Sequence, residues 1–272
     1  REQLIQTWLQ ATLQTDQFEI NFLAGDASFR RYARIKLQNK TYMLMDAPPE
    51  KEDCVPFVEI DEFFDKNGVR VPHIVAKDLS LGLLLLEDFG DVVLSTLLND
   101  DTVDQYYAQS FKQLIDLQQI DAHQQLPAYS YEKLMTEMRL LTEWMLPSLE
   151  IQPTEQQLET IEQAFDFLAI EAINQPQVIV HRDYHSRNLM KIENEQVLGV
   201  IDFQDAVIGA DTYDLISITR DAYVQWNAVR VYGWFEVFYN LLPATAKENR
   251  SFEQFKRDAD FMAIQRDRKS VV

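Results

Sequence analysis

The chain has 272 residues, of which 46% are hydrophobic, enough to bury a large core in one domain or in two lobes. Its 44 acidic residues outnumber its 25 basic ones, and the net charge of −19 disfavours nucleic acid and anionic membrane as partners. A single cysteine, Cys54, excludes an internal disulfide, and no Cys/His spacing is typical of zinc, so we expect a cytoplasmic protein. No apolar run approaches the roughly 20 residues that a membrane-spanning helix needs.

The first part of the chain shows mainly strand patterns. Short runs rich in β-branched and aromatic residues are separated by polar turns, which is typical of a small antiparallel sheet. The opening residues have the amphipathic period of a helix and do not resemble a signal peptide. Strands are predicted at 18–22, 31–37, 41–45, 74–76 and 83–86, and helices at 1–15 and 54–66.

The remainder is mainly helical. Apolar residues recur at three- and four-residue spacing from about 94 to 172, and short apolar runs follow at 178–180, 189–190 and 197–201. The predicted fold is therefore α+β with two lobes. We expect an N-terminal nucleotide-binding lobe at 1–88 and a C-terminal helical lobe at 89–272 that carries the catalytic loop and the acceptor site.

The most informative motif is His-Arg-Asp-Tyr-His-Ser-Arg-Asn at 181–188, followed by Ile-Asp-Phe at 201–203. Asp183 is the candidate catalytic base, which would orient an acceptor hydroxyl and take its proton. Asn188 and Asp202 offer the hard oxygen ligands that Mg²⁺ prefers. Single motifs of this kind are commonly turn or capping residues. The full set, with each part next to an apolar run, favours phosphoryl transfer from ATP.

Neighbouring polar residues have supporting roles. We expect His181 to position the loop rather than to transfer protons, and Asp214 to bond the loop's backbone from the first turn of a helix that Asp211 would cap. His185 and Arg187 face either substrate or solvent. Asp205 is either a third carboxylate near the metal or a turn residue.

Two segments of the first lobe are candidates for binding ATP. Gly25-Asp26-Ala27-Ser28 joins two strands, and Arg30, Arg31 and Arg34 follow as candidate cations for the phosphates, with Arg31 on the opposite face of the strand from the other two. Glu87 to Phe89 follows a strand where a connecting segment would offer backbone groups to adenine. The residues expected to bind the cofactor are Gly25, Ser28, Arg31, Glu87 and Phe89. The alternatives are an ordinary hairpin turn and an ordinary strand end.

On the 181–188 loop, the 201–205 motif, the 84–90 segment and the 211–214 run, the chain resembles the aminoglycoside phosphotransferase and choline kinase superfamily, which has a protein-kinase-like fold. Gly-Asp-Ala-Ser-Phe-Arg-Arg-Tyr at 25–32, the segment 45–54 and Asp-Phe-Gln-Asp-Ala at 202–206 are similar to the bacterial anomeric kinases of N-acetylmuramate and N-acetylglucosamine in cell-wall recycling. The resemblance covers most of residues 1–265 and implies a sugar kinase that uses ATP and Mg²⁺.

The sequence departs from the resemblance at two places. Kinase-like folds usually carry a lysine on the third strand, paired with an acid on the next helix, and 41–46 contains none. Arg30, Arg31 or Lys36 would replace it, or metal would hold the triphosphate, which leaves Glu59 without its expected role as the acidic partner. The chain also stops at Val272, where members of this group look longer, so part of the acceptor wall is expected to be missing.

The acceptor is left open among several classes of molecule. A cell-wall amino sugar is the leading prediction, with an aminoglycoside, a choline-like acceptor or a catalytically inactive nucleotide-binding module as alternatives. An aromatic cage for a quaternary amine would need Trp144, Tyr223, Trp226 and Trp234 to come together, although their helical spacing favours core packing. The candidate substrate residues are His185, Arg187, Asp205, Trp144 and Arg220. The oligomeric state does not follow from the sequence.

Overall fold

The computed structural model describes residues 1–24 and 29–269, with side chains described as far as Arg266. By its internal contacts the chain forms two compact units. The first contains residues 1–92 and 190–204, and the second contains residues 93–189 and 205–272. The α+β plan predicted from the sequence is confirmed.

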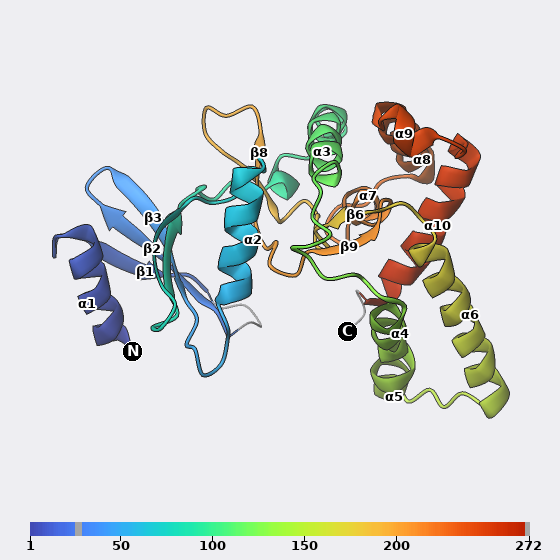
Figure 1. The fold of residues 1–272 in the computed structure, drawn as a ribbon, viewed down its shortest axis with the longest axis horizontal. Coiled ribbons are helices and arrows are strands. Elements are labelled where there is room, and N and C mark those ends of the chain that lie inside the picture. Colours follow the sequence, from blue (N-terminus) through green and yellow to red (C-terminus); the bar gives the residue numbers. More distant parts are fainter. Residues whose placement is uncertain (25–28, 270–272) are drawn as a thin grey trace. The chain divides into compact units, whose positions relative to one another are not determined.

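The first unit is built on a five-stranded antiparallel sheet in the order β1-β2-β3-β5-β4. Helices α1 and α2 lie on opposite sides of this sheet (Figure 1). The bounds are α1 Glu2–Leu13, β1 Glu19–Phe22, β2 Arg31–Leu37, β3 Lys40–Asp46, α2 Val55–Lys66, β4 Ile74–Asp78 and β5 Leu83–Glu87.

The alternation of apolar residues decides which face of this sheet is covered. Ala33 and Ile35 on β2 and Leu44 on β3 point to one face, where they pack with Ile5 and Leu9 of α1 in a fully buried cluster. Ala33 and Ile35 are two residues apart, so the residues on either side of each of them on β2 point to the other face. Arg31 shares the α1 face, whereas Tyr32, Arg34 and Lys36 do not.

A glycine fixes the approach of β3 to β5. Gly82 has a φ of +63°, and a Cβ placed on it would lie 1.8 Å from the carbonyl oxygen of Ala47. The amide of Ala47 in turn donates to the carbonyl oxygen of Gly82 at 2.9 Å. Any other residue at position 82 would have to displace this backbone contact.

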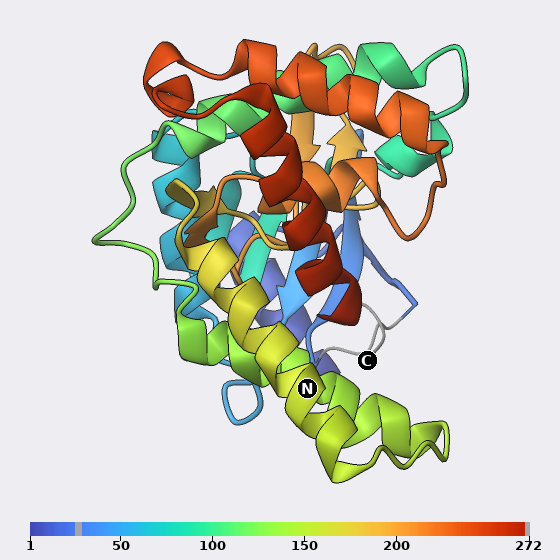
Figure 2. The same cartoon turned by 90° about the vertical axis from the view of Figure 1, so that its right-hand side faces the viewer.

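The second unit is mainly helical. Helix α10 packs against α4, α6, α7 and α8, and Figure 2 shows it running beside α6. Its elements are a 3₁₀ turn Leu94–Thr96, α3 Val103–Gln118, α4 Tyr131–Leu140, a π turn Leu141–Met145, α5 Leu146–Ser148, α6 Glu155–Ile173, β6 Gln177–Val180, β9 Val207–Ala210, α7 Tyr213–Thr219, α8 Ala228–Leu241, α9 Ala244–Lys247 and α10 Phe252–Lys269.

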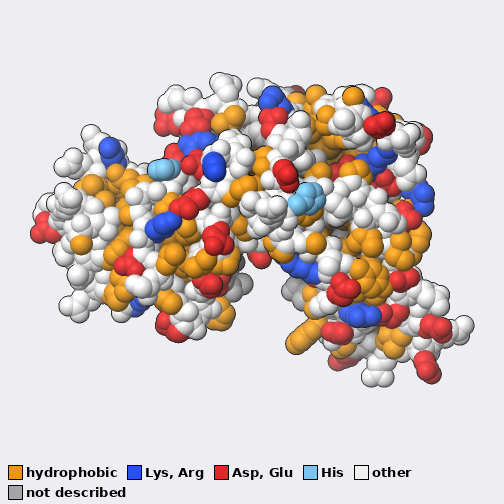
Figure 3. Space-filling model, viewed as in Figure 1, with side chains coloured by type: hydrophobic (Ala, Val, Ile, Leu, Met, Phe, Trp, Pro, Cys, Tyr) orange, Lys and Arg blue, Asp and Glu red, His pale blue; other side chains and the backbone are white. Residues whose placement is uncertain are grey.

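Short strands frame the two polar motifs. β6 pairs with β9, and β7 (Leu189–Lys191) pairs with β8 (Leu198–Val200), so the strands on either side of the 181–188 loop belong to different two-stranded sheets. Acidic side chains are spread over both units on the face drawn in Figure 3, in keeping with the net charge. Within the described residues, no helix is long and apolar enough to cross a membrane.

Candidate active site

The loop that carries Asp183 lies in the second unit and is fixed by a buried carboxylate. Asp214, in the first turn of α7, accepts hydrogen bonds from the backbone N–H groups of His181 at 2.6 Å and Arg182 at 3.1 Å. Burial raises the pKa of Asp214 to about 7, while the two N–H groups favour its ionised form. Arg182 has a φ of 77°, a conformation that a non-glycine residue adopts only where its surroundings hold it.

Internal hydrogen bonds set the positions of Asp183 and Asn188. The amide of Asp183 donates to Nδ1 of His181 at 3.2 Å, which gives His181 a contact with the loop it was expected to position. The carbonyl oxygen of Asp183 accepts from the side-chain Nδ2 of Asn188 at 3.0 Å and from the amide of His185 at 2.9 Å. Because the nitrogen of the Asn188 side chain bonds the loop, its oxygen, the atom that can bind a metal, points away from Asp183 O.

The buried side of the loop is anchored to α3 and to the segment after α7. The hydroxyl of Tyr184 donates to the carbonyl oxygen of Ser110 at 3.0 Å. Both the amide of Ser186, at 2.8 Å, and its hydroxyl donate to Oδ2 of Asp221. Asp221 is buried, and the sequence analysis missed it, because an aspartate after a helix gives no sign of a partner 35 residues earlier.

Arg182 and Asp205 lie close together in the second unit. The guanidinium of Arg182 pairs with Glu137 at 2.7 Å and lies 5.4 Å from the ring centroid of Tyr129, while Asp205 is 3.7 Å away and largely exposed. Glu137 is a second residue that the sequence analysis missed, since it lies on α4 within an ordinary amphipathic pattern. Asp205 lies in a turn, which is one of the two roles that the sequence left open for it.

Asp202 lies in the first unit, two residues after the end of β8. It is exposed, with a φ of 65°, and its Oδ1 accepts from the side-chain amide of Gln204 at 2.9 Å. The next residue, Phe203, is fully buried, and its ring lies 5.0 Å from that of Phe57 and 5.8 Å from that of Phe64 on α2. The buried ring therefore anchors the exposed carboxylate.

The arginines near β2 have different partners. Arg30 pairs with Glu52 at 2.6 Å and is attracted by the charge of Asp202. Arg31 is held on the α1 face by the fully buried Asp46, which also binds Arg1. Arg34 binds Asp88 at 2.7 Å and Asp91 at 2.8 Å.

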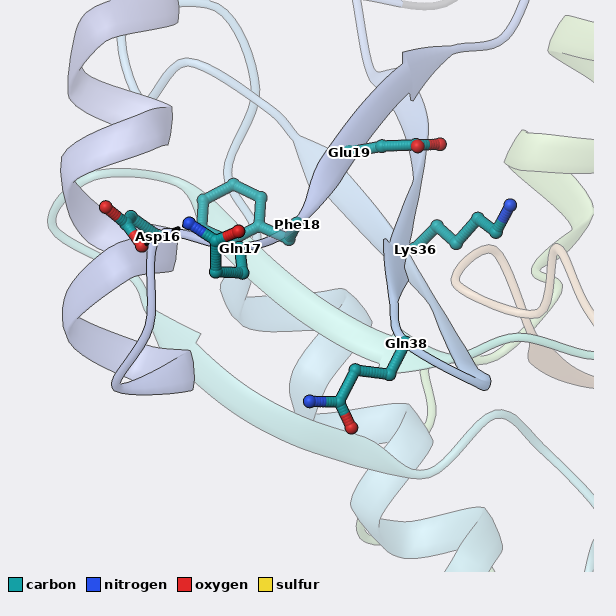
Figure 4. A pocket seen from close by; sticks show the side chains of 6 residues that line it. All are labelled: Asp16, Gln17, Phe18, Glu19, Lys36 and Gln38. Carbon is teal, nitrogen blue, oxygen red and sulfur yellow. Dashed lines mark hydrogen bonds between the residues drawn. The ribbon is translucent and has the colours of Figure 1, made fainter.

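Lys36 and Glu59 occupy exposed positions in the first unit. Lys36 is the cross-strand partner of Glu19 and, with Asp16, Gln17, Phe18 and Gln38, lines a pocket at the β1–β2 end of the sheet. The side chains of Lys36 and Glu19 extend to the same side of the strand pair (Figure 4). Glu59 is exposed on α2.

The side chains at the end of β5 are engaged in structural contacts. Glu87 binds Arg70 at 2.6 Å, and Arg70 also binds Glu195 at 2.7 Å. Phe89 is buried beneath the Arg70 guanidinium, and a Cβ on Gly199 would lie 2.4 Å from its ring. Any contact of this segment with adenine would therefore come from the backbone. Gly25 and Ser28 lie outside the described residues.

The aromatic residues considered for a cage do not form one. Trp226 and Trp234 pack in a T-shaped arrangement with centroids 5.6 Å apart, and the guanidinium of Arg230 lies 5.2 Å from the first ring and 5.6 Å from the second. Arg230 thus occupies the position that a quaternary amine would need. Trp144 is 64% exposed in the π turn, and Tyr223 contacts Arg187.

Two further candidates have structural partners. Arg220 pairs with Asp260 on α10 at 2.7 Å. The prediction that Asp211 caps α7 was wrong, because the helix is preceded by Thr212 and Asp211 forms a buried ion pair with Arg250 at 2.6 Å. Among the described residues, no group of three or more His, Cys, Asp or Glu could hold a metal ion. A metal bound here would therefore need ligands from the nucleotide or from water.

Comparisons with known proteins identify relatives. A model of the phosphotransferase enzyme family matches residues 19–248. The N-acetylmuramate/N-acetylglucosamine kinase of Pseudomonas putida is 38% identical over 250 residues, 91% of this chain and 73% of that protein. The protein of the same name from Neisseria meningitidis is 32% identical over 98% of this chain and 80% of its own length.

Solved structures share the fold at low sequence identity. An ethanolamine kinase from Plasmodium vivax has a TM-score of 0.68 and 14% identity over 93% of this chain and 75% of its own. An aminoglycoside phosphotransferase in complex with streptomycin and ATP has a TM-score of 0.65 and 15% identity over 99% of this chain and 98% of its own. Both similarities extend over nearly the whole chain.

Proposed function

Because the chain belongs to the phosphotransferase enzyme family, we propose that it transfers the γ-phosphoryl group of ATP to the anomeric hydroxyl of N-acetylmuramate or N-acetylglucosamine. The observation that carries this proposal is the 32–38% identity, over more than nine tenths of the chain, to kinases named for these two sugars. The names of these relatives support the identity of the acceptor. The buried hydrogen bonds that fix the Asp183 loop support phosphoryl transfer as the reaction.

In the proposed reaction, Asp183 orients the acceptor hydroxyl and takes its proton. A bond forms between the sugar oxygen and the γ-phosphorus, the bond from that phosphorus to the β–γ bridging oxygen breaks, and ADP leaves with the electron pair. The anomeric hydroxyl is the most acidic one on such a sugar, so an ordinary carboxylate suffices as the base. The hydrogen bonds that the backbone N–H groups of His181 and Arg182 donate to Asp214 hold the loop of Asp183 in place before substrate binds.

Asp202 and the side-chain oxygen of Asn188 are the proposed protein ligands of Mg²⁺. An exposed carboxylate and an amide whose nitrogen already bonds the loop fit the oxygen-rich, partly hydrated coordination that this ion prefers. When bound, the ion would neutralise charge on the nucleotide phosphates.

Arg30 is the proposed replacement for the strand-three lysine. Its ion pair with Glu52 provides a cation and an acid in the first unit, and the charge of Asp202 attracts it. Arg31 is held by Asp46 on the opposite face, and Lys36 lies at the β1–β2 end of the sheet. We propose that Arg30, and not Arg31, binds the phosphates of ATP.

The experiment that tests this function is an ADP-release assay with N-acetylmuramate, N-acetylglucosamine, kanamycin and choline as acceptors. We expect turnover with the two sugars and an acid-labile sugar phosphate by phosphorus NMR. Methylating the anomeric hydroxyl should abolish turnover. Rapid ADP release with the methyl glycoside, or with kanamycin but neither sugar, would overturn the assignment of the acceptor. Failure to release ADP with any acceptor would favour an inactive nucleotide-binding module.

A further inference from the structure

Arg187, on the Asp183 loop, is stacked on an aromatic ring. Its guanidinium carbon lies 3.8 Å from the ring centroid of Tyr223, and both side chains are exposed. A guanidinium on an aromatic face is held by cation–π attraction and by stacking, whereas its N–H groups point outward in its own plane. The contact therefore fixes the orientation of Arg187 and leaves its donor edge accessible.

The ring beneath Arg187 is tied to the same loop. Oδ1 of the buried Asp221 accepts from the amide of Tyr223 at 2.8 Å, while its Oδ2 accepts from the amide of Ser186, also at 2.8 Å. The ring of His185 meets that of Tyr223 edge-on, with centroids 5.2 Å apart. Arg187 and Tyr223 are thus parts of one hydrogen-bonded assembly that includes the loop of the proposed base.

Arg187 forms no ion pair within the described part of the chain. No carboxylate of these residues lies within 4.0 Å of its guanidinium, although the chain has a large excess of acidic residues. Other arginines of the second unit do have acidic partners, in the pairs Arg139–Glu162, Arg182–Glu137, Arg220–Asp260, Arg230–Asp100, Arg250–Asp211 and Arg257–Glu171.

A carboxylate-bearing acceptor would need such a cation. The net charge of −19 repels an anionic sugar at long range. Charges beyond about 8 to 10 Å are largely screened at physiological salt, so the side chains at the site determine whether an anionic sugar binds. N-acetylmuramate differs from N-acetylglucosamine by a lactyl ether that ends in a carboxylate. A planar guanidinium matches a carboxylate with two parallel hydrogen bonds.

We propose that Arg187, held on Tyr223, binds the lactyl carboxylate of N-acetylmuramate and thereby sets the preference of the enzyme between its two sugars. This inference rests on the proposed function. N-acetylglucosamine has no group for Arg187 to bind, so the two acceptors should depend on this residue to different extents.

The test is the ratio of kcat/KM for N-acetylmuramate to that for N-acetylglucosamine. Arg187→Gln should lower this ratio roughly 10- to 100-fold, the scale of a lost charge-assisted hydrogen-bonded pair. Arg187→Lys should keep part of the preference, because it retains the charge without the planar fork. Tyr223→Leu should lower the ratio by less than Arg187→Gln, since the guanidinium remains but loses its support.

Two controls separate this role from a general loss of charge or fold. Arg139→Gln removes an arginine from an exposed ion pair on α4 and should leave the ratio unchanged. The methyl ester of N-acetylmuramate lacks the negative charge, so the wild-type protein and Arg187→Gln should use it equally well.

A failure of this inference and a failure of the proposed function would give different results. If the wild-type protein phosphorylates neither sugar, the function fails, and calorimetric titration of N-acetylmuramate into both proteins without ATP still tests Arg187. Equal binding by the wild type and Arg187→Gln would overturn the inference. An equal fall in kcat/KM for both sugars would overturn it as well, because Arg187 would then act on the reaction and not on the carboxylate.

Discussion

Asp214 holds the backbone of Arg182 in a left-handed conformation: the φ of Arg182 is 77°, and its N–H donates to Oδ1 of Asp214 at 3.1 Å. Such a conformation costs roughly 1–3 kcal/mol in a non-glycine residue, so it persists only where its surroundings impose it. A buried carboxylate on α7 thus determines the path of the chain directly before Asp183.

Removing that carboxylate should destabilise the protein. Asp214→Ala leaves the N–H groups of His181 and Arg182 without their acceptor, and we expect the free energy of unfolding to fall by roughly 2–5 kcal/mol. Asp214→Asn keeps one acceptor oxygen, so its free energy of unfolding should fall by less. Urea unfolding of the two variants measures the difference, and an alanine variant as stable as the asparagine variant would contradict this role.

Replacing the proposed base should separate chemistry from nucleotide binding. We expect Asp183→Asn to lower kcat by roughly 100-fold or more while the Kd for ATP stays within a few-fold, because the carboxylate acts on the acceptor hydroxyl. Steady-state kinetics and calorimetric titration of ATP give the two quantities. A kcat within threefold of the wild type would remove Asp183 from this role.

Asp202→Ala should abolish magnesium-dependent turnover, since it removes one of two proposed protein oxygen ligands. Turnover measured across a range of magnesium concentrations tests this, with Glu59→Gln as a control that removes an exposed carboxylate from the same unit. If the magnesium dependence of Asp202→Ala matched that of the control, the metal site would have to lie elsewhere.

Arg30→Met should raise KM for ATP by roughly tenfold or more, the scale of a lost charge-assisted contact with phosphate. Arg30→Lys should recover part of the loss. Lys36→Met removes a positive charge at the β1–β2 end of the sheet and serves as the matched control, for which we expect no change. Similar KM values for Arg30→Met and Lys36→Met would show that another group binds the triphosphate.

A buried aspartate on α2 should make stability depend on pH. Burial, followed by the charges of Asp65 and Glu62, raises the pKa of Asp61 to about 7, and Lys77 only partly offsets this. Because this pKa lies above that of the unfolded chain, the contribution to stability is full below about pH 4 and is lost as pH rises through 7.

Asp61→Asn should therefore raise the melting temperature at pH 8 and have little effect at pH 4. The shift in pKa sets an upper bound of about 4 kcal/mol on the gain. Thermal unfolding at the two pH values measures it, with Glu59→Gln as a control that removes an exposed carboxylate from the same helix. Equal effects of Asp61→Asn at both pH values would show that Asp61 does not titrate between them.

Much of the fold followed from local patterns. The alternation around Ala33 and Ile35 predicted β2, and the helical spacing of Trp226 and Trp234 favoured the packed arrangement that the structure shows. The pairing of β6 with β9 was not predicted, because strands this short carry little information about their partners. The motifs at 181–188 and 201–203 were recognised by their residue types, and the roles proposed for their residues stay predictions.

The partners of charged residues could not be predicted in the same way. Nothing in the sequence around Asp221 indicates that it joins Ser186 to Tyr223, and a run of arginines does not reveal that Arg31 binds a buried aspartate while Arg30 binds Glu52. Such pairs depend on which surfaces the fold brings together, and hydrophobic spacing does not encode that choice.

The first unit is assembled from two separate stretches of chain, 1–92 and 190–204. Its α2 packs against Phe203, which is translated more than 130 residues after the end of that helix. During synthesis on the ribosome, the surface of α2 that contacts Phe203 therefore stays exposed until residue 203 has been made. By then, residues 93–189 of the second unit have already been synthesised. A protein truncated after residue 92 would expose the same surface permanently, which makes aggregation of such a fragment, or its capture by chaperones, the expected fate.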